Sequence, residues 1–216
     1  MPEIKALLQG FQRFRGQLFE PNRDLFNQLA RKGQSPKVLV IGCSDSRVDP
    51  AIILDTAPGE LFVVRNVANL VPPCELMGMY HGTSAALEFA VCHLQVKSII
   101  VLGHAQCGGI RALLESDGEQ DKGTSFIAAW VKIAVPAREK VLARWPAADK
   151  EFQQRACERA SILVSLENLL SFPFVKERVE DGSLRLFGWY FDIDSGELLQ
   201  YDPERRRFHD LYFDYE

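Results

Sequence analysis

Apolar residues recur every three or four positions over several long stretches of the chain, which is the spacing of one face of an α-helix. In the first stretch, residues 3–32, this spacing predicts two helices, because Pro21 marks the start of the second and Gly33 marks its end. Later stretches with the same spacing, one of them interrupted at Pro136, predict further helices over residues 82–94, 125–142 and 151–170.

Short, continuous apolar runs rich in β-branched residues predict the strands. Residues 37–42, 61–67 and 98–103 lack the alternation of a strand with one face in water. We therefore expect them to be buried on both faces, as strands of a parallel sheet are. Residues 184–193 and 198–201 flank an Asp-Ser-Gly turn sequence and predict a hairpin.

The order of these elements predicts an α/β fold with a mainly parallel central β-sheet flanked by helices. No repeat, low-complexity tract or linker divides the sequence, so we expect a single domain over residues 1–216. Within it, residues 1–33 form an N-terminal helical arm and residues 34–216 the α/β core, with the C-terminal hairpin at the sheet edge. The phenylalanine-rich arm would need a partner to cover it.

Composition and charge exclude several classes of function. The chain has 216 residues, 47% of them hydrophobic, and a net charge of −4, which is unlike a nucleic-acid-binding protein. No stretch approaches the roughly 20 apolar residues of a membrane span, and the first residues do not resemble a secretory signal. The five cysteines are an odd number, which argues against a disulfide framework. We expect a cytoplasmic protein with reduced thiols.

Residues that bind metal ions follow two of the predicted strands. The first strand runs into Cys43, and the third runs into His104, with Cys107 three positions further on. Functional residues of open α/β sheets collect outside the carboxyl ends of the parallel strands, so these three side chains are expected to lie together. Two thiolates and one imidazole suit zinc, and three protein ligands leave a fourth position open, as in catalytic sites. The sequence therefore predicts one catalytic Zn²⁺ per chain.

The sequence Cys-Ser-Asp-Ser-Arg at positions 43–47, followed by His-x-x-Cys-Gly-Gly at positions 104–109, resembles the β-class carbonic anhydrases. The similarity continues through residues 58–69 and 82–94 and into the hairpin. The resemblance implies the same ligands for zinc, and reversible hydration of CO2 to bicarbonate and a proton by a zinc-bound hydroxide. It also implies a homodimer or a dimer of dimers.

The resemblance assigns roles to further residues. Asp45 and Arg47 match the catalytic dyad, in which the arginine keeps the carboxylate ionised and oriented. Gln34 matches a residue that offers its amide to the substrate at the metal of the neighbouring subunit. Apolar walls for CO2 and a backbone N–H for the product are expected from Phe62, Val67, Phe89 and Gly108.

An open zinc site is expected because a regulatory anion site is incomplete. Some members of the family bind a second bicarbonate through a tryptophan, an arginine and a tyrosine, which favours coordination of the aspartate to zinc. The matching positions here are Val40, Arg65 and Phe191, so only the arginine remains. Each lost hydrogen-bond partner costs an anion roughly 1–3 kcal/mol.

Two other functions share these residues. The same zinc site could hydrolyse CS2 or COS, which are linear molecules like CO2. Alternatively, the chain is a zinc-stabilised binding module in which Asp45 fills the fourth ligand position permanently. Assays of the three substrates and of zinc removal separate these alternatives.

Overall fold

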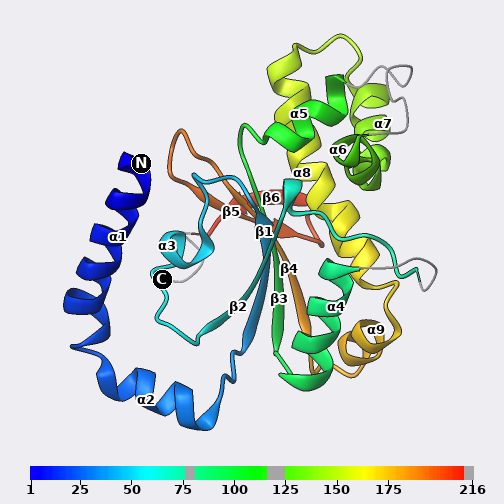
Figure 1. Ribbon diagram of the computed structural model, residues 1–216. Helices are drawn as coiled ribbons and strands as arrows, with labels where there is room; N and C mark the ends of the chain where they lie inside the picture. The colour runs from blue at the N-terminus through cyan, green and yellow to red at the C-terminus, as the bar shows by residue number, and fades with distance from the viewer. Residues whose placement is uncertain (76–80, 116–124, 212–216) are drawn as a thin grey trace. The chain divides into compact units, whose positions relative to one another are not determined.

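The structure is a computed structural model that describes residues 1–75, 81–115 and 125–211 (Figure 1). By contacts within the chain it divides into two compact units, Met1–Ser35 and Pro36–Glu216. In the described ranges, no helix combines the length and the apolar character that crossing a membrane requires.

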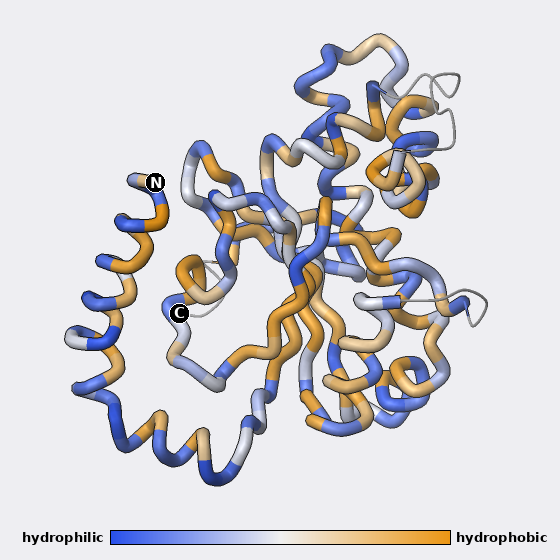
Figure 2. Tube along the Cα trace, in the orientation of Figure 1, coloured by the Kyte–Doolittle hydropathy of each residue, from blue (hydrophilic) through white to orange (hydrophobic). Residues whose placement is uncertain are grey.

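The N-terminal unit contains the two predicted helices. They are α1 (Pro2–Phe14), which continues as a π-helical turn (Arg15–Phe19), and α2 (Arg23–Lys32). Gly33 ends α2 with φ +75°, a conformation that glycine adopts without strain. Figure 2 shows apolar and polar residues alternating along both helices. Much of the apolar stripe is exposed, including Ile4, Leu7, Leu8, Phe11 and Leu18.

The second unit is built on a six-stranded sheet in the order β2-β1-β3-β4-β5-β6. The first four strands are parallel, and the last two are antiparallel. The mainly parallel sheet and its hairpin, β4 with β5, confirm the sequence prediction, whereas β6 was not predicted. The strands are β1 (Val38–Cys43), β2 (Leu61–Asn66), β3 (Ser98–His104), β4 (Arg185–Phe191), β5 (Leu198–Asp202) and β6 (Arg207–Asp210).

The three strands predicted to be fully buried differ in their exposure. All but the first residues of β1 and β3 are buried. In contrast, β2 is only partly buried, and Val63 on it is 39% exposed. The prediction of full burial is wrong for β2 because it is the edge strand of the sheet and has a strand neighbour on one side only.

Helices connect the strands and flank the sheet in Figure 1. The predicted helix over residues 125–142 is broken by a 3-10 turn (Lys132–Ala134). Pro136 lies in the first turn of the next helix, where its missing N–H costs no hydrogen bond within the helix. The sequence did not predict α3, α5 or α9. The helices are α3 (Pro50–Ile53), α4 (Gly82–Glu88) with a π-helical turn (Phe89–His93), α5 (Gly108–Glu115), α6 (Phe126–Val131), α7 (Val135–Arg144), α8 (Lys150–Leu169) and α9 (Pro173–Glu180).

The longest helix, α8, packs closely on the middle of the sheet. Gly103 of β3 and Gly188 of β4 both face Ile162, and a Cβ atom added at either glycine would come within 2.7 or 2.8 Å of that side chain. Only glycine permits this approach without a shift of the helix. The close packing brings Glu158, one turn before Ile162, to the buried side of the chain that follows β3.

Candidate metal centre and active site

Three side chains of the types that bind metal ions meet where β1 and β3 end. The two strands are neighbours, and they place Cys43 and His104 at the same edge of the sheet. The ligand atoms of Cys43, His104 and Cys107 all lie within 4.8 Å of one another, and all three residues are buried. The two sulfur atoms are 4.0 Å apart. Tetrahedral zinc with Zn–S bonds of about 2.3 Å would hold them about 3.8 Å apart, so the spacing fits this ion.

The orientation of His104 also fits a metal ligand. Its Nδ1 lies 2.8 Å from the carbonyl oxygen of Ala105, and because a carbonyl only accepts, Nδ1 carries the proton and donates. Nε2 therefore holds the free lone pair. This atom is buried and has no hydrogen-bond partner among the described residues. A bound metal ion would satisfy it.

The two thiols influence each other's ionisation. A hydrogen bond from Cys107 lowers the pKa of the Cys43 thiol, and the backbone N–H of Asp45 adds a second hydrogen bond to this sulfur, at 3.4 Å. The pKa of Cys107 is raised in turn, chiefly by its interaction with Cys43. The Cys43 thiol thus ionises readily, and its negative charge disfavours ionisation of the Cys107 thiol. A cation between the sulfur atoms would stabilise both thiolates.

A buried carboxylate supports the Cys107 turn from behind. Glu158 on α8 is 2% exposed, and its Oε1 accepts a hydrogen bond from the backbone N–H of Cys107 at 2.8 Å. Gln154 donates to the same oxygen, and the Tyr190 hydroxyl donates to Oε2. Burial raises the pKa of Glu158. Sequence reasoning missed this residue. The available signal was its position four residues before Ile162, which places an acidic residue on the buried face of the helix.

Asp45 and Arg47 form an ion pair beside the three candidate metal ligands. The Arg47 guanidinium donates from Nε to Oδ1 at 2.9 Å and from Nη2 to Oδ2 at 2.8 Å, and the backbone N–H of Arg47 donates to Oδ1 at 3.0 Å. These hydrogen bonds hold the pKa of Asp45 well below its usual value. The carboxylate therefore stays ionised, with both oxygens engaged.

Arg65 fixes the backbone of the turn that carries this pair. It donates from Nε to the carbonyl of Cys43 at 2.9 Å and from Nη2 to the carbonyl of Asp45 at 2.7 Å. Nη1 donates to the Asp49 carboxylate at 2.8 Å. Each nitrogen of this guanidinium therefore already has a partner within the protein.

Comparisons with known proteins agree with this geometry. The family model described as "Carbonic anhydrase" matches residues 38–198. A carbonic anhydrase of Synechococcus elongatus is 36% identical over 197 residues, which cover 91% of this chain and 71% of the relative. The solved β-carbonic anhydrase CcaA superposes with a TM-score of 0.91 at 37% identity, over 97% of this chain and 92% of that one. The chain belongs to the β-class carbonic anhydrases.

Fungal β-carbonic anhydrases share the fold as well. One of two tetrameric enzymes from Sordaria macrospora gives a TM-score of 0.81 at 30% identity, over 93% of this chain and 97% of that one. CafA of Aspergillus fumigatus gives 0.80 at 30% identity, over 94% of each chain. These matches confirm the resemblance found in the sequence. As a carbonic anhydrase, the chain catalyses the reversible hydration of CO2 to bicarbonate and a proton.

The structure brings together only some of the residues expected to line the CO2 pocket. The rings of Phe62 and Phe89 lie 5.9 Å apart, between β2 and the helical segment after α4. Val67 follows β2 and is 37% exposed, and Gly108 is exposed at the start of α5. Gln34 belongs to the N-terminal unit, where its side chain is exposed.

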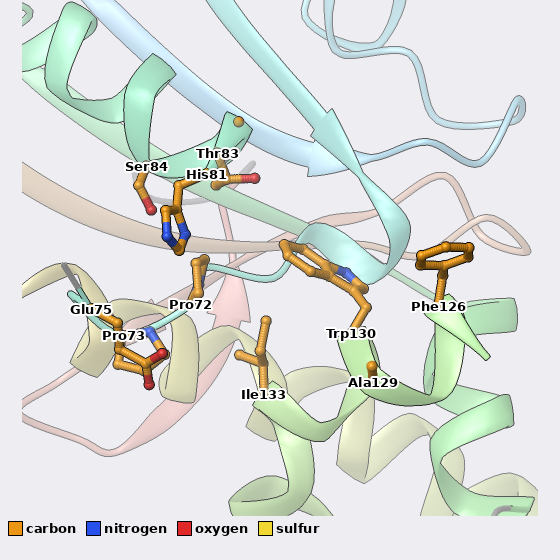
Figure 3. Close-up of a pocket in the computed structure, with 11 residues that line it drawn as sticks. Pro72, Pro73, Glu75, His81, Thr83, Ser84, Phe126, Ala129, Trp130 and Ile133 are labelled. Carbon is orange, nitrogen blue, oxygen red and sulfur yellow. The ribbon is translucent and has the colours of Figure 1, made fainter. Parts of the chain in front are cut away.

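Trp130 lines hollows beside these residues, and sequence reasoning missed it. Its indole N–H donates to the carbonyl of Val67 at 2.7 Å, so α6 is attached to the chain just after β2. Trp130 and Phe126 line two hollows, of about 460 and 390 Å³. Figure 3 shows Trp130 and Ile133 on one side of the smaller hollow, with Pro72 and His81 across from them. A tryptophan in a short apolar helix was the available signal.

Proposed function

We propose that each subunit binds one zinc ion through Cys43, His104 and Cys107 and hydrates CO2 there with the help of Asp45 and Arg47. The observation that carries the assignment of the metal is the buried Nε2 of His104, which has no hydrogen-bond partner among the described residues and lies beside two sulfur atoms 4.0 Å apart. When bound, zinc lowers the pKa of a water molecule from 15.7 to about 7, which supplies a nucleophile at neutral pH.

Asp45 orients the nucleophile in this proposal. Its backbone N–H lies 3.4 Å from the sulfur of Cys43, and besides Arg47 the nearby His104 also lowers the pKa of its carboxyl group, so the carboxylate is close to the proposed metal ligands. As an ion, it accepts a hydrogen bond from the attacking water and directs the oxygen lone pair at the carbon of CO2. Arg47 keeps Asp45 ionised and leaves it in one orientation.

The substrate and product need different surroundings. CO2 is apolar, and we assign its walls to Phe62, Phe89 and Val67. Bicarbonate is an anion and needs donors, which we assign to the backbone N–H of Gly108 and to the amide of Gln34 from a neighbouring subunit.

An assembly follows from that role of Gln34. The enzymes of Sordaria macrospora are described as tetrameric, and we propose a homodimer or a dimer of dimers for this chain. The exposed apolar stripe of α1 supports an interface in the N-terminal unit. On this proposal, residues 1–33 and 34–216 work as a single domain. Five free cysteines favour the cytoplasm, where thiols stay reduced.

We further propose that the fourth ligand position is open to solvent. Support comes from Asp45, both of whose oxygens are held by Arg47. Three of the five N–H groups of Arg65 donate to two backbone carbonyls and the Asp49 carboxylate, and Val40 is completely buried. A second bicarbonate would therefore find no donor on the side chains of Val40 and Phe191 and would compete with these partners for Arg65, and we expect no cooperative inhibition by this anion.

The decisive experiment combines metal analysis with stopped-flow assays. We expect one zinc per chain and CO2 hydration whose rate rises across about pH 6–9 as the nucleophile forms. CS2 and COS are assayed in parallel with the same preparation. Zinc without hydration activity at any pH would indicate a binding module, and hydrolysis of CS2 or COS alone would indicate the other enzyme.

A further inference from the structure

Gln106 stands between the catalytic arginine and a second carboxylate. We propose that Gln106 is a positioning residue that binds the Asp194 carboxylate, so that Arg47 stays paired with Asp45. The paired Asp45 oxygens then do not take the fourth ligand position of the metal. The inference rests on the proposed roles of Asp45 and Arg47.

The turns that carry Gln106 and Asp194 lie side by side. Gln106 follows β3, and Asp194 lies in the turn between β4 and β5. The two parallel strands β3 and β4 are neighbours, and the pairing extends past their ends, because the backbone N–H of Ala105 donates to the carbonyl of Phe191 at 2.9 Å. The turn of the hairpin thereby reaches the active-site edge of the sheet.

The amide of Gln106 faces opposite charges at its two ends. Its Nε2 donates to both oxygens of Asp194, at 3.0 Å each. Its Oε1 lies 3.5 Å from Nη1 of Arg47, and its backbone carbonyl accepts from Nη2 of Arg47 at 3.1 Å. An NH2 group only donates and a carbonyl oxygen only accepts, so these partners fix the direction of the amide.

Arg47 therefore has two carboxylates within its electrostatic reach. Asp45 holds it directly, and Asp194 adds to the attraction that raises the pKa of Arg47. Gln106 donates to both oxygens of Asp194, and Nη2 of Arg155 lies 3.6 Å from Oδ2 of the same carboxylate. With the amide removed, the flexible, half-exposed guanidinium could turn to Asp194, and Asp45 would lose the donors that engage both of its oxygens.

The backbone at Gln106 gives no reason for a long side chain. Its φ is +57°, in the left-handed region where glycine is favoured and other residues are strained. Gln106→Gly thus removes the amide while relieving strain, and the carbonyl that accepts from Arg47 stays in place. Gln95 is a matched control, because it is also exposed, has φ +54° and lies outside this site.

The test compares the wild-type enzyme with Gln106→Gly, Gln106→Gly/Asp194→Ala and Gln95→Gly. We expect Gln106→Gly to lower kcat about fivefold with full zinc content, and the double variant to recover to within about twofold of the wild type, because the competing carboxylate is gone. After cobalt replaces zinc, the visible spectrum of Gln106→Gly should shift towards that of a carboxylate-ligated metal, and the double variant should return to the wild-type spectrum. Gln95→Gly should match the wild type.

Two results would overturn the inference. One is a Gln106→Gly enzyme with the rate and cobalt spectrum of the wild type. The other is a double variant that stays as slow as the single variant, which would mean that Asp194 does not compete for Arg47. A wild-type chain that binds zinc but does not hydrate CO2 would instead contradict the proposed function. The two failures are therefore distinguishable.

Discussion

Two turns build the active site, and they are held in opposite ways. The turn after β1 carries Asp45 and Arg47 near the surface, and a cation beneath it, Arg65, binds its carbonyl groups. The turn after β3 carries the buried candidate ligand Cys107, and a buried carboxyl group on α8, that of Glu158, accepts a hydrogen bond from the backbone N–H of this residue. The difference separates two tasks. On the proposed roles of these residues, the partly exposed charges of Asp45 and Arg47 set the reaction rate at little cost in stability, whereas the buried groups set metal binding and stability.

Magnitudes support this division. A partly exposed ion pair such as Asp45 with Arg47 contributes about 0–1 kcal/mol to folding. A buried polar group that loses its partner costs roughly 1–3 kcal/mol. Substitutions of Cys107 and of its buried partner Glu158 should therefore change metal content or stability, whereas substitutions of Asp45 and Arg47 should change turnover with the metal retained.

The largest effect is expected for Cys107→Ser. A neutral hydroxyl is a far poorer zinc ligand than a thiolate, so zinc content should fall close to zero and CO2 hydration should be lost. Atomic absorption on the purified protein measures the zinc content, and a stopped-flow assay measures CO2 hydration. Cys92→Ser is the control, because Cys92 is exposed and outside the metal cluster. Full zinc occupancy in Cys107→Ser would remove this residue from the site.

The next largest effect is expected for Glu158→Ala. The change leaves the N–H of Cys107 and the hydroxyl of Tyr190 buried without their acceptor, so the free energy of unfolding should fall by about 2–4 kcal/mol. Urea unfolding measures it. Glu158→Gln should lose much less, because an amide oxygen still accepts from Cys107 and the Tyr190 hydroxyl can turn to accept. Equal losses in both variants would mean that the negative charge itself is required.

A smaller effect is expected for Asp45→Asn. The variant keeps the shape of the side chain but removes the charge that pairs with Arg47, so kcat should fall about tenfold or more, or about 1.4 kcal/mol of barrier. Zinc content should not change. Asp181→Asn is a suitable control, because Asp181 is exposed and precedes β4, at the other end of the strands. Unchanged turnover at neutral pH would limit the pair to a structural role.

The sequence predicted that the candidate metal ligands lie together, but it did not predict the residue that holds the Cys107 backbone, Glu158. Cys43 and His104 end apolar runs that only buried strands explain, and adjacent parallel strands bring such ends together. Glu158 could not be assigned in the same way. Its helical spacing indicates a buried face, but which buried N–H it meets depends on how α8 packs against two glycines.

Contacts between residues that follow neighbouring strands could not be predicted from the sequence either. The amide of Gln106 meets Asp194 because β3 and β4 are neighbours, and 88 residues separate the two side chains in the sequence. The strand β6 was missed because it is short and begins in an arginine-rich run, where propensity is weak and pairing with β5 decides the structure.

The smallest effect concerns stability and tests the exposed turn alone. Arg47 lowers the pKa of folded Asp45, so the ionised pair stabilises the protein above the unfolded-state pKa of about 3.9, and this contribution is lost as the pH falls below that value. The unfolding free energies of wild type and Asp45→Asn should therefore differ by less than about 1 kcal/mol, constantly from about pH 8 to pH 5, with the gap closing towards pH 3. Urea unfolding at successive pH values measures the gap. A gap of several kcal/mol at neutral pH would show that this turn also holds the fold, and the division between the two turns would not stand.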